Sequence, residues 1–105
     1  MITRIRGELA EIKDGVALVH IEALTYELLI PAADISSLLS QVGNKVEFFT
    51  LHYFEGQSQG SSFTPRLIGF ANDRDRAFFE LFTTVKGIGN RKALRALIRP
   101  FSETA

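Results

Sequence analysis

Residues 44–54 read NKVEFFTLHYF, a strongly strand-like stretch of this 105-residue chain. Branched and aromatic side chains pack well on a pleated sheet and favour the extended backbone. The residues that follow, EGQSQGSSFTP at 55–65, are rich in Gly, Ser and Pro and predict a long, mobile loop. This part of the sequence therefore predicts a strand that ends in a flexible connection.

Four further strands are predicted around this one. ITRIRGELAEI at 2–12 alternates imperfectly between apolar and polar residues, with Gly7 as a candidate bulge. KDG at 13–15 supplies a turn, and VALVHIEALTYELLIP at 16–31 holds two strands broken near residues 22–24. AADISSLLSQVG at 32–43 predicts a short helix or turn, and RLIGFA at 66–71 a final strand. Five strands fit a Greek-key barrel of the OB type, whereas the second-ranked alternative, a β-sandwich, normally needs about seven.

After Ala71 the apolar spacing changes from two residues to the helical period. ANDRDRAFFELFTTV at 71–85 offers Asn72 or Asp73 as N-cap and places four apolar side chains on one face, namely Phe78, Phe79, Phe82 and Val85. NRKALRALIRPF at 90–101 predicts a second helix that ends at Pro100. We therefore expect a barrel over residues 1–71 that oligomerises and faces DNA, and an incomplete helical-hairpin domain over 72–105.

The charge is distributed unevenly, although the whole chain has a formal net charge of zero. Residues 1–71 hold five cations against eight acids, a net charge of −3, and residues 72–105 hold seven cations against four acids, a net charge of +3. Opposite charges on two segments indicate two functional parts, of which the second attracts a polyanion. A chance imbalance between short segments is the alternative.

The turn between the two predicted helices carries the functional motif. Gly87 and Gly89 flank Ile88, and without Cβ atoms they allow a phosphate to approach the backbone. The amides that follow lie at a helix N-terminus, where unpaired N–H groups and the helix dipole favour an anion. The predicted phosphate-binding set is Lys86, Gly87, Ile88, Gly89, Asn90, Arg91, Lys92 and Arg95. Such contacts read no bases, so binding is expected to be independent of sequence and sensitive to salt.

No catalytic centre, metal site or cofactor site is predicted. The chain contains no cysteine, and His20 and His52 have no second metal ligand at a useful spacing. The start of the chain has no apolar signal segment, and no stretch approaches the ~20 apolar residues of a membrane span. We expect a soluble, cytoplasmic protein. The aromatic residues Phe48, Phe49, Tyr53 and Phe54 are expected in the core and in a subunit interface rather than as platforms for stacked bases.

Several segments, in this order, resemble the N-terminal half of the RuvA family, whose members bind Holliday junctions. The matching segments are MITRIRGELAE at 1–11, YELLIP at 26–31, LIGFA at 67–71, DRAFFELF at 75–82 and VKGIGNRKALRAL at 85–97. The resemblance implies an OB-fold domain followed by a first helix-hairpin-helix. It also implies a homotetramer that holds a four-way junction open, and a RuvB-type ATPase ring that drives branch migration.

The chain departs from the family pattern in three respects. RuvA proteins are about twice as long, and the second hairpin and the C-terminal domain that docks on the ATPase have no counterpart in these 105 residues. The family carries an acidic pair, or pin, at the centre of the junction; Glu55 matches one of these acids, but Gly56 stands in place of the second. In the segment EALTYE at 22–27, only Tyr26 and Glu27 match the family.

The leading hypothesis is a non-catalytic subunit that binds branched DNA in recombination and repair as a homo-oligomer. An alternative is a protein-interaction or regulatory OB module that no longer handles junctions. A second alternative is a glycosylase or nuclease built on the hairpin, but only RPFSETA at 99–105 follows the second predicted helix, without the nucleophile or the acid cluster that such enzymes need.

Overall fold

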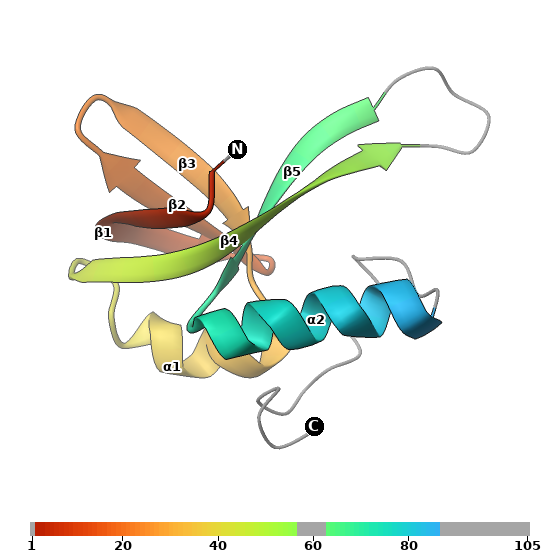
Figure 1. Ribbon diagram of the computed structural model, residues 1–105. Coiled ribbons are helices and arrows are strands. Elements are labelled where there is room, and N and C mark those ends of the chain that lie inside the picture. The colour runs from red at the N-terminus through yellow and green to blue at the C-terminus, as the bar shows by residue number, and fades with distance from the viewer. Residues whose placement is uncertain (1, 57–62, 87–105) are drawn as a thin grey trace.

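The computed structural model describes residues 2–56 and 63–86 (Figure 1). Its strands close into a barrel in the order β1-β2-β3-β5-β4, which fits an OB fold and rules out the two-sheet sandwich. The strands are β1 (Arg4–Lys13), β2 (Val16–Ile21), β3 (Leu24–Leu29), β4 (Lys45–Gly56) and β5 (Phe63–Phe70). The helices are the 3-10 helix η1 (Ala32–Asp34), α1 (Ile35–Leu39) and α2 (Asp73–Lys86).

Two tight turns connect the first three strands. Asp14 and Gly15 have φ angles of 53° and 76° and join β1 to β2, where Lys13 pairs with Val16. Glu22 has a φ of 55° at the second turn. Two-residue turns with positive φ match the twist of the strands that they connect. Both predicted strand breaks are therefore confirmed.

The bulge in β1 lies at a different position from the one predicted. The register with β2 shifts between Leu9 and Glu11, whereas Gly7 pairs regularly with Val46 on β4. A Cβ atom on Gly7 would overlap the carbonyl oxygen of His20. The glycine is therefore required by a close approach of two strands, and the sequence alone does not distinguish that requirement from a bulge.

The loop predicted at 55–65 is shorter than expected, because both strands continue into it. β4 extends to Gly56 and β5 begins at Phe63. The two strands stay paired up to these ends, where Gly56 pairs with Phe63. Proline is tolerated in a strand at an edge without a partner, and β5 pairs with β3 only at Ile68. The β4–β5 ribbon therefore projects beyond the barrel (Figure 1).

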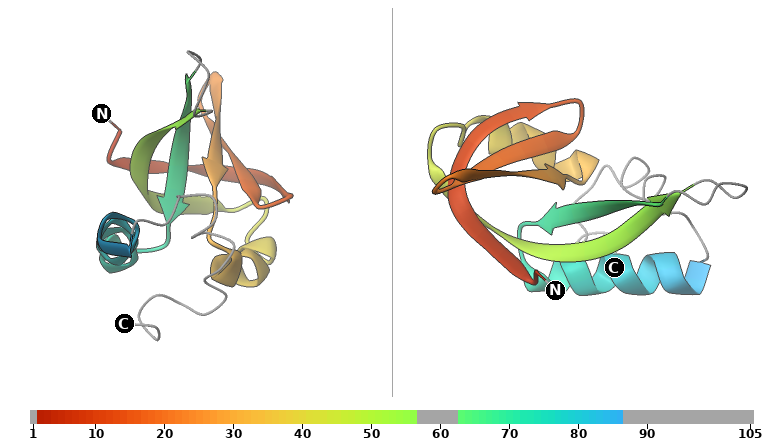
Figure 2. Two further views of the ribbon diagram at one scale, coloured as in Figure 1. Left: turned by 90° about the vertical axis from the view of Figure 1, so that its right-hand side faces the viewer. Right: turned by 90° about the horizontal axis from the view of Figure 1, so that it is seen from above.

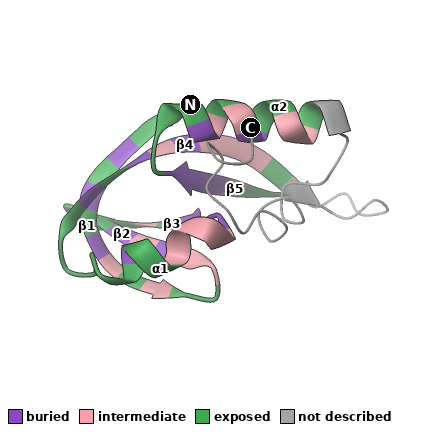
Figure 3. Ribbon diagram, turned by 90° about the horizontal axis from the view of Figure 1, so that it is seen from below, coloured by how far each residue is buried: buried purple, intermediate pink, exposed green. Residues whose placement is uncertain are grey.

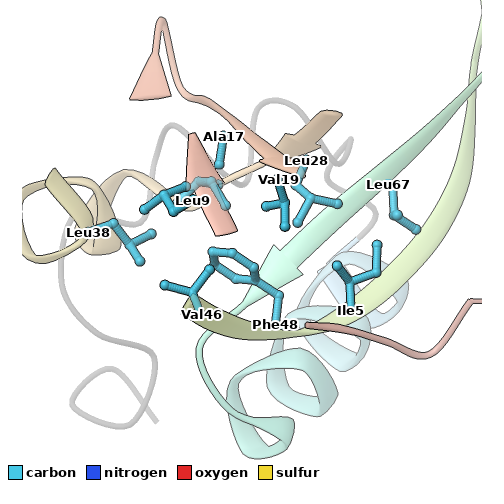
Figure 4. Packing of buried hydrophobic residues seen from close by; sticks show 10 residues of the cluster. Ile5, Leu9, Ala17, Val19, Leu28, Leu38, Val46, Phe48 and Leu67 are labelled. Atoms are coloured by element: carbon cyan, nitrogen blue, oxygen red, sulfur yellow. The ribbon is translucent and has the colours of Figure 1, made fainter. Parts of the chain in front are cut away.

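The barrel interior is filled by apolar side chains from β1 to β5 and from α1 (Figure 4). Phe48 and Leu9 are almost completely buried, and Leu38 of α1 closes one end of the barrel. The predicted short helix is thus confirmed, but Leu39 and Val42 are 54% and 44% exposed rather than packed in the core. Leu38 and, partly buried, Ile35 are the side chains of this helix that pack against the barrel core.

A second apolar cluster attaches α2 to the barrel. This helix-docking cluster consists of Leu29, Ile68, Phe70 and Phe79, with Leu51, Tyr53, Phe78 and Phe82 packed around it. The rings of Phe70 and Phe79 lie 5.1 Å apart in a tilted arrangement, a favourable geometry for aromatic pairs. α2 runs along the β4–β5 ribbon with its buried stripe inward (Figures 2 and 3). The predicted apolar face of this helix is confirmed for Phe78, Phe79 and Phe82.

Phe79→Ala should detach α2 from the barrel. Truncating a fully buried phenylalanine typically costs about 3–5 kcal/mol of unfolding free energy, and Phe79 has 0% exposure. Leu81→Ala is the matched control, because Leu81 lies on the same helix but is 61% exposed. Chemical denaturation should show a large loss for the first variant and a change within about 0.5 kcal/mol for the second. Equal effects of the two substitutions would contradict this packing.

Candidate nucleic-acid interface

The predicted phosphate-binding set begins at the point where the described part of α2 ends. Lys86 is the last described residue of this helix, and its backbone position is fixed by α2. The remaining members, Gly87, Ile88, Gly89, Asn90, Arg91, Lys92 and Arg95, lie outside the described residues, as does the predicted second helix. The structure therefore shows how the barrel carries the first predicted helix, while the phosphate-binding turn stays a prediction.

A side-chain cap fixes the start of α2. The backbone N–H of Asp75 donates to Oδ1 of Asn72 at 2.8 Å, so Asn72 is the N-cap that the sequence offered together with Asp73. Nδ2 of Asn72 donates to Oδ2 of Asp75 at 3.4 Å, so the cap side chain is also tied to the side chain of the third helical residue. The cap and the helix-docking cluster together define the direction in which α2 leads toward Lys86.

Two acidic side chains approach each other beside this cap. Burial raises the pKa of Asp34, and the nearby Asp75 carboxylate raises it further. Burial also raises the pKa of Asp75, while Arg74 and the hydrogen bond from Asn72 act in the opposite direction. One oxygen of each carboxyl group, Oδ2 of Asp34 and Oδ1 of Asp75, is buried without a hydrogen-bond partner in the described structure. This pair was not predicted from the sequence, because 40 residues lie between its two members.

Glu55, the predicted acid of the pin, lies near the far end of the β4–β5 ribbon. It is the penultimate residue of β4 and pairs with Thr64 on β5. The ribbon and α2 extend from the barrel toward the same side of the molecule (Figures 1 and 2). The fold therefore directs Glu55 and Lys86, which are far apart in the sequence, to one side of the barrel.

Cations on the outer surface of the barrel are partly neutralised by an acid. Nε of Arg4 and Nε of Arg6 lie 3.8 Å and 3.6 Å from the same Oε2 of Glu47. Arg4 also lies over the ring of Phe49, 5.5 Å from its centroid. These side chains are exposed and contribute little to stability. The Glu47 carboxylate interacts with both guanidinium groups and offsets part of their charge. This surface therefore attracts phosphate less strongly than the two arginines of β1 would alone.

Among the residues that the structure describes, neither histidine belongs to a cluster of metal ligands. Nδ1 of His20 lies 2.6 Å from the Thr25 hydroxyl, and His52 lines a groove between β3 and the ribbon. Within residues 2–56 and 63–86, no three His, Cys, Asp or Glu side chains are placed to hold a metal ion. Among the same residues, no helix is both long and apolar enough to cross a bilayer.

Comparison with known proteins gives consistent matches. A family model described as the RuvA N terminal domain matches residues 1–59. The Holliday junction branch migration complex subunit RuvA of Rhodopirellula baltica is 41% identical over 105 residues, which is 100% of this chain and 51% of that protein. The corresponding subunit of Desulfosudis oleivorans is 32% identical over 105 residues, or 100% of this chain and 50% of that protein. The chain thus spans about half the length of the curated relatives it matches.

Asp34→Asn should stabilise the protein at neutral pH and lose this advantage in acid. The raised pKa of Asp34 means that its protonated form fits the folded state better. The associated stability is fully present below the unfolded pKa of about 3.8 and is lost as the pH rises through the folded pKa. Thermal unfolding from pH 3.5 to 7.5 should show the two curves separating as the pH rises. A separation that is largest in acid would contradict the assignment.

Proposed function

Since the chain belongs to the RuvA N-terminal domain family, we propose that it is a non-catalytic subunit that binds four-way DNA junctions in recombination and repair. The match over residues 1–59, together with 41% identity to a branch-migration subunit across the whole chain, carries this proposal. The family relationship favours this role over a regulatory OB module without junction handling. In this role the subunit works beside a RuvB-type ATPase, which supplies the motor.

The contacts that fix α2 on the barrel support the proposal. The helix-docking cluster holds Phe79 against Phe70 and Ile68 of the barrel, and the Asn72 cap fixes the first turn. A phosphate-binding turn that follows directly on a fixed helix loses less conformational freedom when it binds. We assign the contacts with DNA to Lys86 and to the backbone amides and cations from Gly87 to Arg95.

Assembly is the second part of the proposal. One hairpin that contacts about 2 phosphates binds weakly, whereas four hairpins on a shared scaffold of barrels act together through their effective concentration. We propose that the barrels form a homotetramer. Their acidic residues leave most phosphate contacts to residues 72–105, which have a net charge of +3.

Salt titration measures how many phosphates the assembly contacts. For about 2 phosphates per chain, the slope of log affinity against log salt should be about −7 for a tetramer on one junction and about −2 for a monomer. Band-shift titrations of a four-way junction and a linear duplex, combined with sizing in solution, test this expectation. Affinity that does not change with salt, or equal affinity for junction and duplex, would refute the proposal.

Gly89→Val should weaken junction binding without unfolding the barrel. A branched side chain at this position would obstruct the approach of a phosphate to the backbone. Ala77→Val adds similar bulk on the exposed face of α2 and serves as the control. Loss of one phosphate contact per chain should reduce affinity about 10-fold or more in a tetramer. If Gly89→Val bound the junction as tightly as the parent chain, the phosphate cradle would be misassigned.

A further inference from the structure

The barrel closes between β3 and β5 through one short contact, and a groove lies beside that contact. β3 and β5 pair in parallel at Leu29 with Ile68, and beyond this point β3 diverges from the β4–β5 ribbon (Figure 1). A cavity of about 230 Å³ lies between them. It is lined by Ile2, by Tyr26, Glu27 and Leu29 of β3, and by His52, Pro65, Arg66 and Leu67 of the ribbon. The space is large enough for one nucleobase, and apart from His52 and the paired Glu27 and Arg66 its walls are apolar or aromatic.

The ribbon extends this lining outward to an exposed aromatic residue. His52 pairs with Leu67, and Phe54 pairs with Pro65, so all four side chains lie on the same face of the ribbon. Leu67 is 8% exposed at the base of this face, and Phe54 is 71% exposed near its outer end. Tyr53 and Leu51 lie on the opposite face, against the helix-docking cluster. Of the aromatic residues predicted in the core or in a subunit interface, Phe48 is in the core, whereas Phe54 is exposed on the barrel.

Charge and hydrogen bonding at the groove suit a nucleic acid strand with exposed bases. The lining of the groove holds one acid, Glu27, and one cation, Arg66, so it has no net charge with which to repel a polyanion. Nη1 of Arg66 donates to Oε1 of Glu27 at 3.2 Å and joins β5 to β3 across the groove. Nε2 of His52 is buried without a hydrogen-bond partner in the described chain. The polar edge of a base can satisfy such an atom, whereas an apolar side chain cannot.

We propose that this groove and Phe54 bind an unpaired nucleobase at the branch point of DNA. The base stacks on Phe54 and Pro65, and its edge lies toward His52. Stacking is available to every base because each has a π face, so this contact tolerates any sequence. The proposal rests on the proposed function for the choice of DNA as partner, and it adds a contact with bases to a mode of binding otherwise confined to phosphates.

The test uses 2-aminopurine, whose fluorescence falls when it stacks on an aromatic ring. The probe stands either unpaired at the branch point of a four-way junction or within a short single strand, and a fully paired duplex serves as reference. The parent chain should quench both probes. Phe54→Ala should abolish the quenching and weaken single-strand binding about 5- to 150-fold, the range for loss of one stacked base, while duplex binding stays unchanged.

Two further variants separate stacking from general damage. Phe54→Tyr should retain both the quenching and the affinity, since it keeps the ring, and Leu24→Ala, at a leucine that is 59% exposed elsewhere on the barrel, should leave both unchanged. The inference is overturned if Phe54→Ala quenches and binds like the parent. It is also overturned if this variant changes the oligomeric state, because the groove would then be an interface between copies of the chain.

The two proposals fail in different ways. Junction binding that depends on Gly89 but not on Phe54 would overturn the base contact and leave the proposed function intact. Single-strand quenching that depends on Phe54, without preference for a junction over a duplex, would support the base contact and overturn the proposed function.

Discussion

The parallel pairing of Leu29 with Ile68 is the constraint on which the rest of the molecule depends. It closes the barrel between β3 and β5, and both residues also belong to the helix-docking cluster. Because β3 and β5 separate beyond this pair, the same contact defines the base of the groove that Phe54 borders. One short contact between strands therefore closes the barrel, contributes to the helix-docking cluster that holds α2, and defines the base of the groove beside the ribbon.

The barrel and the segment that follows it differ in charge. The barrel has more acids than cations and pairs two of its exposed arginines with Glu47. Its surface is therefore suited to assembly and to a few specific contacts rather than to general binding of phosphate. The excess of cations follows α2, a helix that the barrel holds by Phe79 and caps at Asn72. In our account the C-terminal segment therefore binds the phosphates of DNA, and the groove beside Phe54 on the barrel contacts a base.

Sequence reasoning predicted those elements whose signals are local. The turns at Asp14 and Glu22, the short helix near Leu38 and the cap at Asn72 follow from residue types and spacing. It was wrong about the extent of the β4–β5 ribbon, because Gly, Ser and Pro indicate a loop unless a partner strand holds them in register. It also missed the Asp34–Asp75 pair and the groove beside His52, since both arise from contacts between distant segments. The glycine turn, to which we assign the phosphate contacts, lies outside the described residues and stays a prediction.

Amide hydrogen exchange, with and without a bound four-way junction, tests the central claim most directly. The account predicts slower exchange at the amides from Gly87 to Arg91 when the junction is present, because phosphates would accept hydrogen bonds from them. Amides of the barrel core, such as those of Leu9 and Phe48, should exchange at the same rate in both states. Protection confined to the barrel, with unchanged exchange from Gly87 to Arg91, would contradict the assignment of DNA binding to this turn.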